Sequence, residues 1–299
     1  LDVRAVNFYG LADRNETHYG QPVEDNILHD IVPDLERRSD YRARRAALRA
    51  QNDASPIVKR GIALTPVKFG ISFNATHLNQ AGALVNIYSD GSIIVNHGGT
   101  EMGQGLFTKV QQVVAEELGV VPARVRVSAT DTSKVPNTSA TAASSGSDLN
   151  GMAAKDACRK LRARLAEFVA QKWGVDSGAV RFVADGVEAD TADGLQRWTF
   201  DDLAHKAWFG RVSLSAQGFY RTPKIHWNVK TFKGRPFYYF AYGAACAQVA
   251  IDTLTGEMKV ERVDLLHDVG SSLNPALDKG QVEGAFIQGM GWLDRKSVV

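Results

Sequence analysis

The sequence predicts an α+β fold, with mixed sheets covered by packed helices. Apolar residues lie two positions apart in segments such as 62–73, which is the strand period. In 106–118 they recur at three and four positions, which is the helical period. With 299 residues, 44% of them hydrophobic, the chain has room for two domains or one large one.

Charge and composition exclude several classes of partner. The formal net charge is +2, from 35 basic and 33 acidic side chains, so no field attracts nucleic acid or an acidic membrane surface. No apolar run approaches the roughly 18 residues of a membrane span. The two cysteines, Cys158 and Cys246, have no metal-ligand spacing, and we expect both to be buried in a cytoplasmic protein. An iron–sulfur cluster would need about four thiolates.

The first 73 residues predict two helices and a long strand. Residues 25–51 have a helical period that Pro33 interrupts, so we expect two helices, the second rich in arginine. Residues 62–73 form a long strand, with an irregularity expected at Thr65–Pro66. Residues 1–56 are thus a helical lead-in segment.

A hairpin and two helices follow. Asp90–Gly91 predicts a tight turn in which both residues reach positive φ. Helix 106–118 should end at Gly119, and a later helix, after a short strand at 125–127, at Gly174.

The last 120 residues return to strands. Asp185–Gly186 indicates another hairpin, and Thr199 with Asp202 resembles a capping box. Strands are expected at 237–251 and 260–269, and Asn274–Pro275 is typical of a helix start.

Three segments join small residues to the start of a helix: 98–105, 133–151 and 270–291. Such segments form cradles for phosphate, although tight turns and close helix packing explain each of them as well. None has the spacing of a P-loop or of a dinucleotide-binding fingerprint. Gln104 and Gln281 lie among the glycines, and an amide side chain offers a bound ligand both donors and acceptors.

No catalytic constellation is evident. His97, His205 and His267 are isolated in sequence, which favours structural or surface roles. Glu101 is a possible base by position, but a capping or exposed carboxylate is favoured. By pattern alone, Phe73 belongs to a core.

Taken together, these segments resemble the molybdenum hydroxylase family, which includes aldehyde oxidases, and within it most of all the xanthine dehydrogenases. The resemblance extends from about residue 57 to 292, and GGTEMGQGL is its sharpest signal. Five stretches carry it, in this order: KRGIALTPVKFGISF (59–73), LNQAGALVNIYSDGSI (78–93), GGTEMGQGLFTKV (98–110), VPNTSATAASSGSDLNG (135–151) and DVGSSLNPALDKGQVEGAFIQGMG (268–291).

The resemblance implies a first molybdopterin-binding domain at 57–234 and the truncated start of a second at 235–299, with the cofactor between them. The family hydroxylates purines or aldehydes at an electron-poor carbon. It uses molybdenum held by a pterin dithiolene and a glutamate base. Electrons leave through two iron–sulfur clusters to FAD and, in dehydrogenases, to NAD.

For the substrate, the resemblance implies two residues. Phe73 matches an aromatic that packs on the flat purine ring. Asn74 stands where animal relatives have a threonine whose backbone meets the substrate, so the side-chain environment departs from the family pattern.

For the cofactor, Gln104 and Gln281 match glutamines that contact it. Ala143 matches an alanine whose backbone lies beside the molybdenum, and Ser144 should bond the pterin or its phosphate. Gly146 replaces a serine of some relatives, which removes one phosphate contact.

Other parts of the enzyme are expected outside this chain. The catalytic base should lie beyond Val299, and the arginine and glutamate that orient the purine before Leu1. The 2Fe-2S clusters and FAD belong to other domains or subunits of an oligomer. We treat the polar end, DRKSVV, as the place where a fragment stops, and expect no turnover from this piece alone.

Two alternatives stay open. An aldehyde oxidase is compatible with Phe73, although ISFNATHLNQAGALV and DVGSSLNPA favour the purine enzyme. A non-catalytic domain that kept the cofactor cradle would lack the acidic residue of the family's later Gly-Glu-Pro motif.

Overall fold

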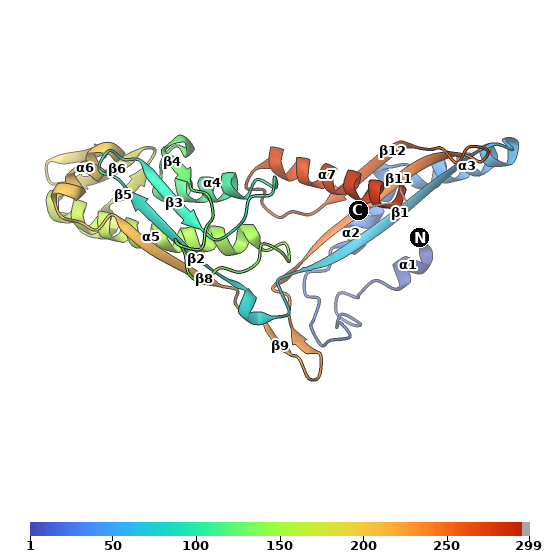
Figure 1. Ribbon diagram of the computed structural model, residues 1–299, viewed down its shortest axis with the longest axis horizontal. Helices are drawn as coiled ribbons and strands as arrows, with labels where there is room; N and C mark the ends of the chain where they lie inside the picture. Colours follow the sequence, from blue (N-terminus) through green and yellow to red (C-terminus); the bar gives the residue numbers. More distant parts are fainter. Residues whose placement is uncertain (295–299) are drawn as a thin grey trace. The chain divides into compact units, whose positions relative to one another are not determined.

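The computed structural model describes residues 1–294 (Figure 1), so DRKSVV lies outside the described residues apart from Asp294. The chain forms two compact units, one made of Leu1–Ile71 and the chain from His226 onward, the other of Ser72–Ile225. The reason is that strand β1 (Val58–Ile71) pairs along its whole length with β11 (Tyr239–Asp252). This packing cuts across the boundaries expected at 57 and 234, and the division into two molybdopterin-binding domains stays a prediction.

The discontinuous unit is a three-stranded antiparallel sheet, in the order β1-β11-β12, with helices α2 and α3 packed on it (Figure 1). Apolar side chains of α2 meet Leu64, Phe240 and Tyr242 of the sheet in one core. The other elements of this unit are α1 (Asp2–Val6), α2 (Leu28–Arg38), α3 (Tyr41–Ala54), β9 (His226–Asn228), β10 (Lys233–Arg235), β12 (Met258–His267) and α7 (Pro275–Asp294).

Two helices are confirmed near the N-terminus, but the position of the break is not where Pro33 suggested. Pro33 lies inside α2, which continues to Arg38. The chain reverses at Asp40, whose φ is 50°, before α3 begins. Burial of Leu28 and Leu35 on the same helix offsets the hydrogen bond that a proline removes.

The irregularity expected at Thr65–Pro66 is absent from β1, where Pro66 pairs in register with Ala244. Because β1 is an edge strand, it can present the proline nitrogen to its open side. The structure instead shows an irregularity between β11 and β12. The register shifts there after Gln248 and leaves Glu261 as the extra residue.

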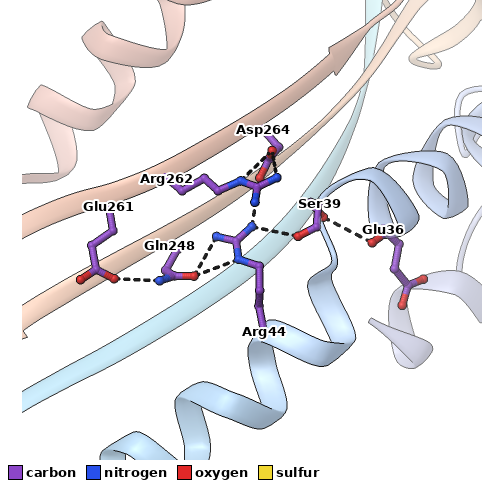
Figure 2. A network of polar contacts seen from close by, with 7 residues as sticks. All are labelled: Glu36, Ser39, Arg44, Gln248, Glu261, Arg262 and Asp264. Atoms are coloured by element: carbon purple, nitrogen blue, oxygen red, sulfur yellow. Dashed lines mark hydrogen bonds and ion pairs between the residues drawn. The ribbon is translucent and has the colours of Figure 1, made fainter.

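A polar network joins α3 to this irregular part of the sheet (Figure 2). The Arg44 guanidinium donates to Gln248 Oε1 at 2.7 and 3.0 Å, to Asp264 Oδ2 at 3.1 Å and to the Ser39 carbonyl at 2.9 Å. Gln248 in turn donates to Glu261 at 2.7 Å. All three nitrogens of the largely buried guanidinium therefore donate hydrogen bonds, which hold α3 on β11 and β12.

The continuous unit is built on a mixed four-stranded sheet, in the order β4-β3-β2-β8, with α4 and α5 packed against it (Figure 1). Only the β3–β4 pair in this sheet is parallel. The elements are η1 (Thr76–Leu78), β2 (Gln80–Ile87), β3 (Ile93–His97), α4 (Leu106–Leu118), η2 (Pro122–Arg124), β4 (Val125–Val127), α5 (Gly146–Trp173), η3 (Ser177–Ala179), β5 (Arg181–Val183), β6 (Gly186–Thr191), β7 (Gly194–Thr199), α6 (Phe200–Phe209) and β8 (Ser215–Arg221).

The hairpin at Asp90–Gly91 is confirmed, but its turn is wider than expected. Ile87 pairs with Ile93, so five residues connect β2 to β3. Only Gly91 of the expected pair has positive φ, at 81°. Asp90 instead accepts hydrogen bonds from the backbone and hydroxyl of Ser92, which stabilise the longer loop.

The predicted helix ends are confirmed. Gly119 and Gly174 end α4 and α5 in left-handed conformations. Thr199 caps α6 by accepting from the Asp202 N–H at 3.1 Å, and Asn274 accepts from the Leu277 N–H at 3.1 Å at the start of α7. No helix between residues 1 and 294 combines the length and apolar character needed to cross a lipid bilayer.

Candidate cofactor site

The glycine-rich loop 98–105 lies against segment 133–145 in the continuous unit. The Thr100 N–H donates to Thr141 Oγ1 at 2.9 Å. Thr130, just before the second segment, donates through its hydroxyl to the Gly99 carbonyl at 2.8 Å. Two of the three segments singled out in the sequence are thus brought together, at the starts of α4 and α5.

Gly98 and Gly99 allow this close approach. A Cβ at Gly98 would overlap the Thr138 side chain, and a Cβ at Gly99 would lie 2.6 Å from both Asn150 Nδ2 and Leu106 Cδ2. These two glycines therefore serve packing between the loop, the second segment and α5.

His97, at the end of β3, contacts the backbone of the glycine-rich loop 98–105. Its side chain is only 3% exposed, and its Nδ1 accepts from the Gly99 N–H at 3.1 Å. The Phe107 ring meets the imidazole edge-on, with the ring centroids 5.2 Å apart. Burial lowers the pKa of His97 to about 4, although Asn150 and Glu101 oppose the shift. The histidine is neutral at physiological pH, and the structural interpretation of it is confirmed.

Glu101 caps α4. Its Oε1 accepts from the N–H groups of Gly103 at 2.9 Å and Gly105 at 3.0 Å, and its Oε2 accepts from Phe107 at 2.9 Å. Burial raises the pKa of Glu101, but the backbone hydrogen bonds outweigh it and the net pKa is lowered. The capping interpretation is therefore confirmed. The Gly103 and Gly105 amides of loop 98–105 are therefore taken by the protein's own carboxylate, and an anion cradle at the other amides of this loop stays a prediction.

Gln104 is held inside the same loop. Its Oε1 accepts from the Met102 N–H at 2.6 Å, and its Nε2 donates to the Thr100 carbonyl at 2.9 Å. An amide oxygen has two lone pairs and an amide nitrogen two N–H groups. These bonds fix the orientation of the amide and leave it one further donor and one further acceptor for a ligand edge.

Ala143 and Ser144 form a strained pair before α5. Both have φ of 55°, the left-handed region, which costs a non-glycine residue on the order of 1–2 kcal/mol. Ser145, at the N-cap, makes no side-chain hydrogen bond to the first turn of α5. Consecutive strained residues without glycine indicate a functional constraint at this helix start.

Phe73 and Asn74 follow β1 in sequence. The Phe73 side chain is half-buried and that of Asn74 is exposed, so the core position that pattern alone suggested for Phe73 is wrong. Buried Asn79 accepts from the Phe73 N–H and donates to its carbonyl, both at 2.8 Å. Sequence reasoning missed Asn79; its position directly before the apolar strand 80–87 was the available signal.

Gln281 lies on α7, in the other compact unit, and its side chain is exposed. A Cβ at neighbouring Gly280 or Gly284 would meet no described atom within 4 Å, so these glycines pack against no second helix in the described chain. That Gln281 joins Gln104 and Ala143 around one ligand stays a prediction.

The family of the chain follows from its comparison with known proteins. Residues 34–294 match the model of the molybdopterin cofactor-binding domain, and the chain belongs to this family. The α+β fold class is confirmed by the same match, and so is the resemblance on which the candidate residues were chosen.

The curated relatives of the chain indicate which members of the family it is similar to. It is 43% identical over 290 residues to xanthine dehydrogenase/oxidase of Gallus gallus, covering 97% of the chain and 20% of the relative. It is 45% identical over 289 residues to xanthine dehydrogenase of Emericella nidulans, covering 97% of the chain and 19% of that relative. An aldehyde oxidoreductase structure from Desulfovibrio desulfuricans shares the fold, with a TM-score of 0.73 and 22% identity over 97% of the chain and 28% of that structure. The chain spans about a fifth of the length of the curated relatives it matches.

Proposed function

We propose that this chain is the part of a xanthine dehydrogenase that holds the molybdenum–pterin cofactor and one wall of the substrate pocket. The observation that carries the proposal is 43–45% identity to xanthine dehydrogenases over 97% of the chain. The enzyme would convert hypoxanthine and xanthine towards urate.

Three residues of the continuous unit would meet the cofactor. When bound, the cofactor supplies a redox-active metal that accepts electrons from the purine. The oriented Gln104 amide would use its remaining donor and acceptor on the pterin edge. The Ser144 hydroxyl, with the start of α5, would bind the phosphate, and the strained backbone of Ala143 would lie beside the molybdenum. Gln281 would also contact the cofactor.

Phe73 would stack on the purine ring. Its backbone is pinned on both sides by Asn79, so the ring is presented from a fixed position. Asn74 would meet the substrate through its backbone, a contact that tolerates the change from threonine.

The remaining steps belong to other parts of the protein. A glutamate base, the residues that orient the purine, two 2Fe-2S clusters, FAD and an NAD site would lie there, on the same polypeptide or on a partner subunit. We also propose that the protein is a cytoplasmic oligomer.

The proposal is tested on the full-length protein by molybdenum and pterin analysis and by urate formation from xanthine. Replacing Phe73→Ala should raise the KM for xanthine about tenfold or more, because an aromatic stacking surface worth about 1.5 kcal/mol is lost. Phe69→Ala, at a half-exposed position on β1, is the control and should leave KM within about twofold.

Other outcomes separate the alternatives. Turnover of an aromatic aldehyde in preference to xanthine would identify an aldehyde oxidase, and bound pterin without turnover of either substrate a non-catalytic domain. The 299-residue chain alone should form no urate. Appreciable urate from it would contradict the expectation that the catalytic base and the redox centres lie on other parts of the protein.

A further inference from the structure

The proposed function gives no part to His97, although it is a buried titratable side chain that contacts the cofactor loop. We propose that His97 is a positioning residue: its neutral imidazole holds the glycine loop 98–105 in its binding conformation by accepting the Gly99 N–H at Nδ1. This inference rests on the proposed function, since the loop carries Gln104.

Gly99 is the point from which the loop is fixed. Its N–H donates to His97 and its carbonyl accepts from Thr130, while the next residue, Thr100, donates to Thr141. Because Gly99 is buried, its N–H has no access to water as a substitute acceptor. Loss of the imidazole acceptor would leave a buried donor unsatisfied, which costs about 1–3 kcal/mol.

The geometry fixes the tautomer. Accepting at Nδ1 requires a lone pair there, so the ring proton lies on Nε2. Within residues 1–294, the buried Nε2 has no hydrogen-bond partner of ordinary geometry, and the polar group nearest the ring is the Asn150 amide of α5. An unpaired N–H is a cost that an apolar side chain would not incur, so the bond at Nδ1 is what histidine contributes at this position.

Protonation would break the arrangement. A second proton on Nδ1 would point at the Gly99 N–H, and two donors cannot share that contact. The groups around the ring are Glu101 on the loop, Asn150 on α5 and Phe107 on α4; of these only Glu101 is charged, and it favours protonation. Burial outweighs it and lowers the pKa of His97 to about 4, so the loop should hold at neutral pH and loosen in acid.

Two substitutions isolate the acceptor. His97→Asn places an amide oxygen close to the position of Nδ1 and does not titrate, whereas His97→Leu removes the acceptor at similar volume. The measurement is hydrogen-exchange protection of residues 98–105 in the full-length protein, with α5 as the reference for global folding and pterin content as a second readout. His97→Leu should lose about tenfold of loop protection and much of the pterin, and His97→Asn should stay within about twofold.

The pH dependence of loop protection gives an independent test of the role of His97. After correction for intrinsic exchange, wild-type loop protection should fall as pH drops from 6.5 towards 4, and the His97→Asn loop should fall less. Both proteins keep Glu101, so its own titration cancels in the comparison.

The inference is overturned if His97→Asn is as damaging as His97→Leu, if His97→Leu leaves the loop protected, or if wild type and His97→Asn share one pH profile. Should His97→Leu also lose protection in α5, the pH comparison of the other two proteins decides. Absence of pterin from the wild-type protein would reject the proposed function, while loop exchange would still decide the role of His97.

Discussion

Helices α4 and α5 begin beside each other, yet their N-termini are completed in opposite ways. The start of α4 is closed by the Glu101 carboxylate, which accepts three backbone N–H groups. The start of α5 follows the strained pair Ala143–Ser144 and has no side-chain bond at its N-cap, although Asp148 lies in its first turn.

The difference shows that richness in glycine does not by itself mark an anion site. The loop before α4 has more glycines and the sharper sequence signal, but at least five of its backbone N–H groups already donate to the protein's own side chains. The segment before α5 accepts backbone strain without glycine, which is stable only where the surrounding structure or a ligand requires it. A phosphate would therefore be expected at α5, and the α4 loop would contribute the oriented amide of Gln104.

The largest effect should come from forcing the two helix starts apart. Gly98→Ala should destabilise the continuous unit by about 2 kcal/mol or more, because the new Cβ overlaps the Thr138 side chain. The loss of stability would be measured by denaturant unfolding, with hydrogen exchange in α5 as the probe of this unit.

A second substitution and a control make this result specific. Thr138→Gly in the same protein should recover much of the lost stability. Gly151→Ala, whose Cβ would lie 3.7 Å from Val113 Cγ2, should be neutral or slightly stabilising. Equal effects of the two glycine substitutions would show that the loops are not packed as described.

A smaller effect is expected from opening the α4 start. Glu101→Gln should cost about 1–2 kcal/mol, since the charge that interacts with the helix N-terminus is lost. Glu116→Gln, at an exposed position near the end of the same helix, should change stability by less than about 0.5 kcal/mol.

The pH dependence of that effect has a definite sign. The pKa of Glu101 is lowered in the folded protein, so its contribution is full above the unfolded value of 4.5 and is lost as pH falls through the folded pKa. The difference between wild type and Glu101→Gln should therefore shrink in acid; a difference that grows there would contradict the cap.

The smallest effect should be stabilising, at the α5 start. Ala143→Gly removes the Cβ that makes φ of 55° unfavourable and should raise the free energy of unfolding by about 1 kcal/mol. Neighbouring Ala142, which lacks positive φ, is the control, and Ala142→Gly should destabilise slightly. Thermal unfolding of both variants compares them, and a loss of stability in both would argue against stored strain at Ala143.

Local signals in the sequence located most helix ends correctly. Gly119, Gly174 and Thr199 act within one turn of chain, through left-handed backbone or a capping hydroxyl, so their neighbours in sequence suffice to predict them. The helix break predicted at Pro33 and the strand irregularity predicted at Pro66 were wrong, because burial of α2 and the edge position of β1 are properties of the folded unit. The motifs that indicated the family were also legible in the sequence, as the match over residues 34–294 bears out.

The sequence by itself determined the α+β class and the family, and it located two of the segments that the structure brings together, because hydrophobic period, helix caps and motifs depend on neighbouring residues. Only the tertiary structure decided which amides remain available to a ligand, that Asn79 holds Phe73, and that His97 supports Gly99. The physical reason is that one carboxylate satisfies backbone N–H groups through space, and a linear pattern does not reveal which donors it has taken.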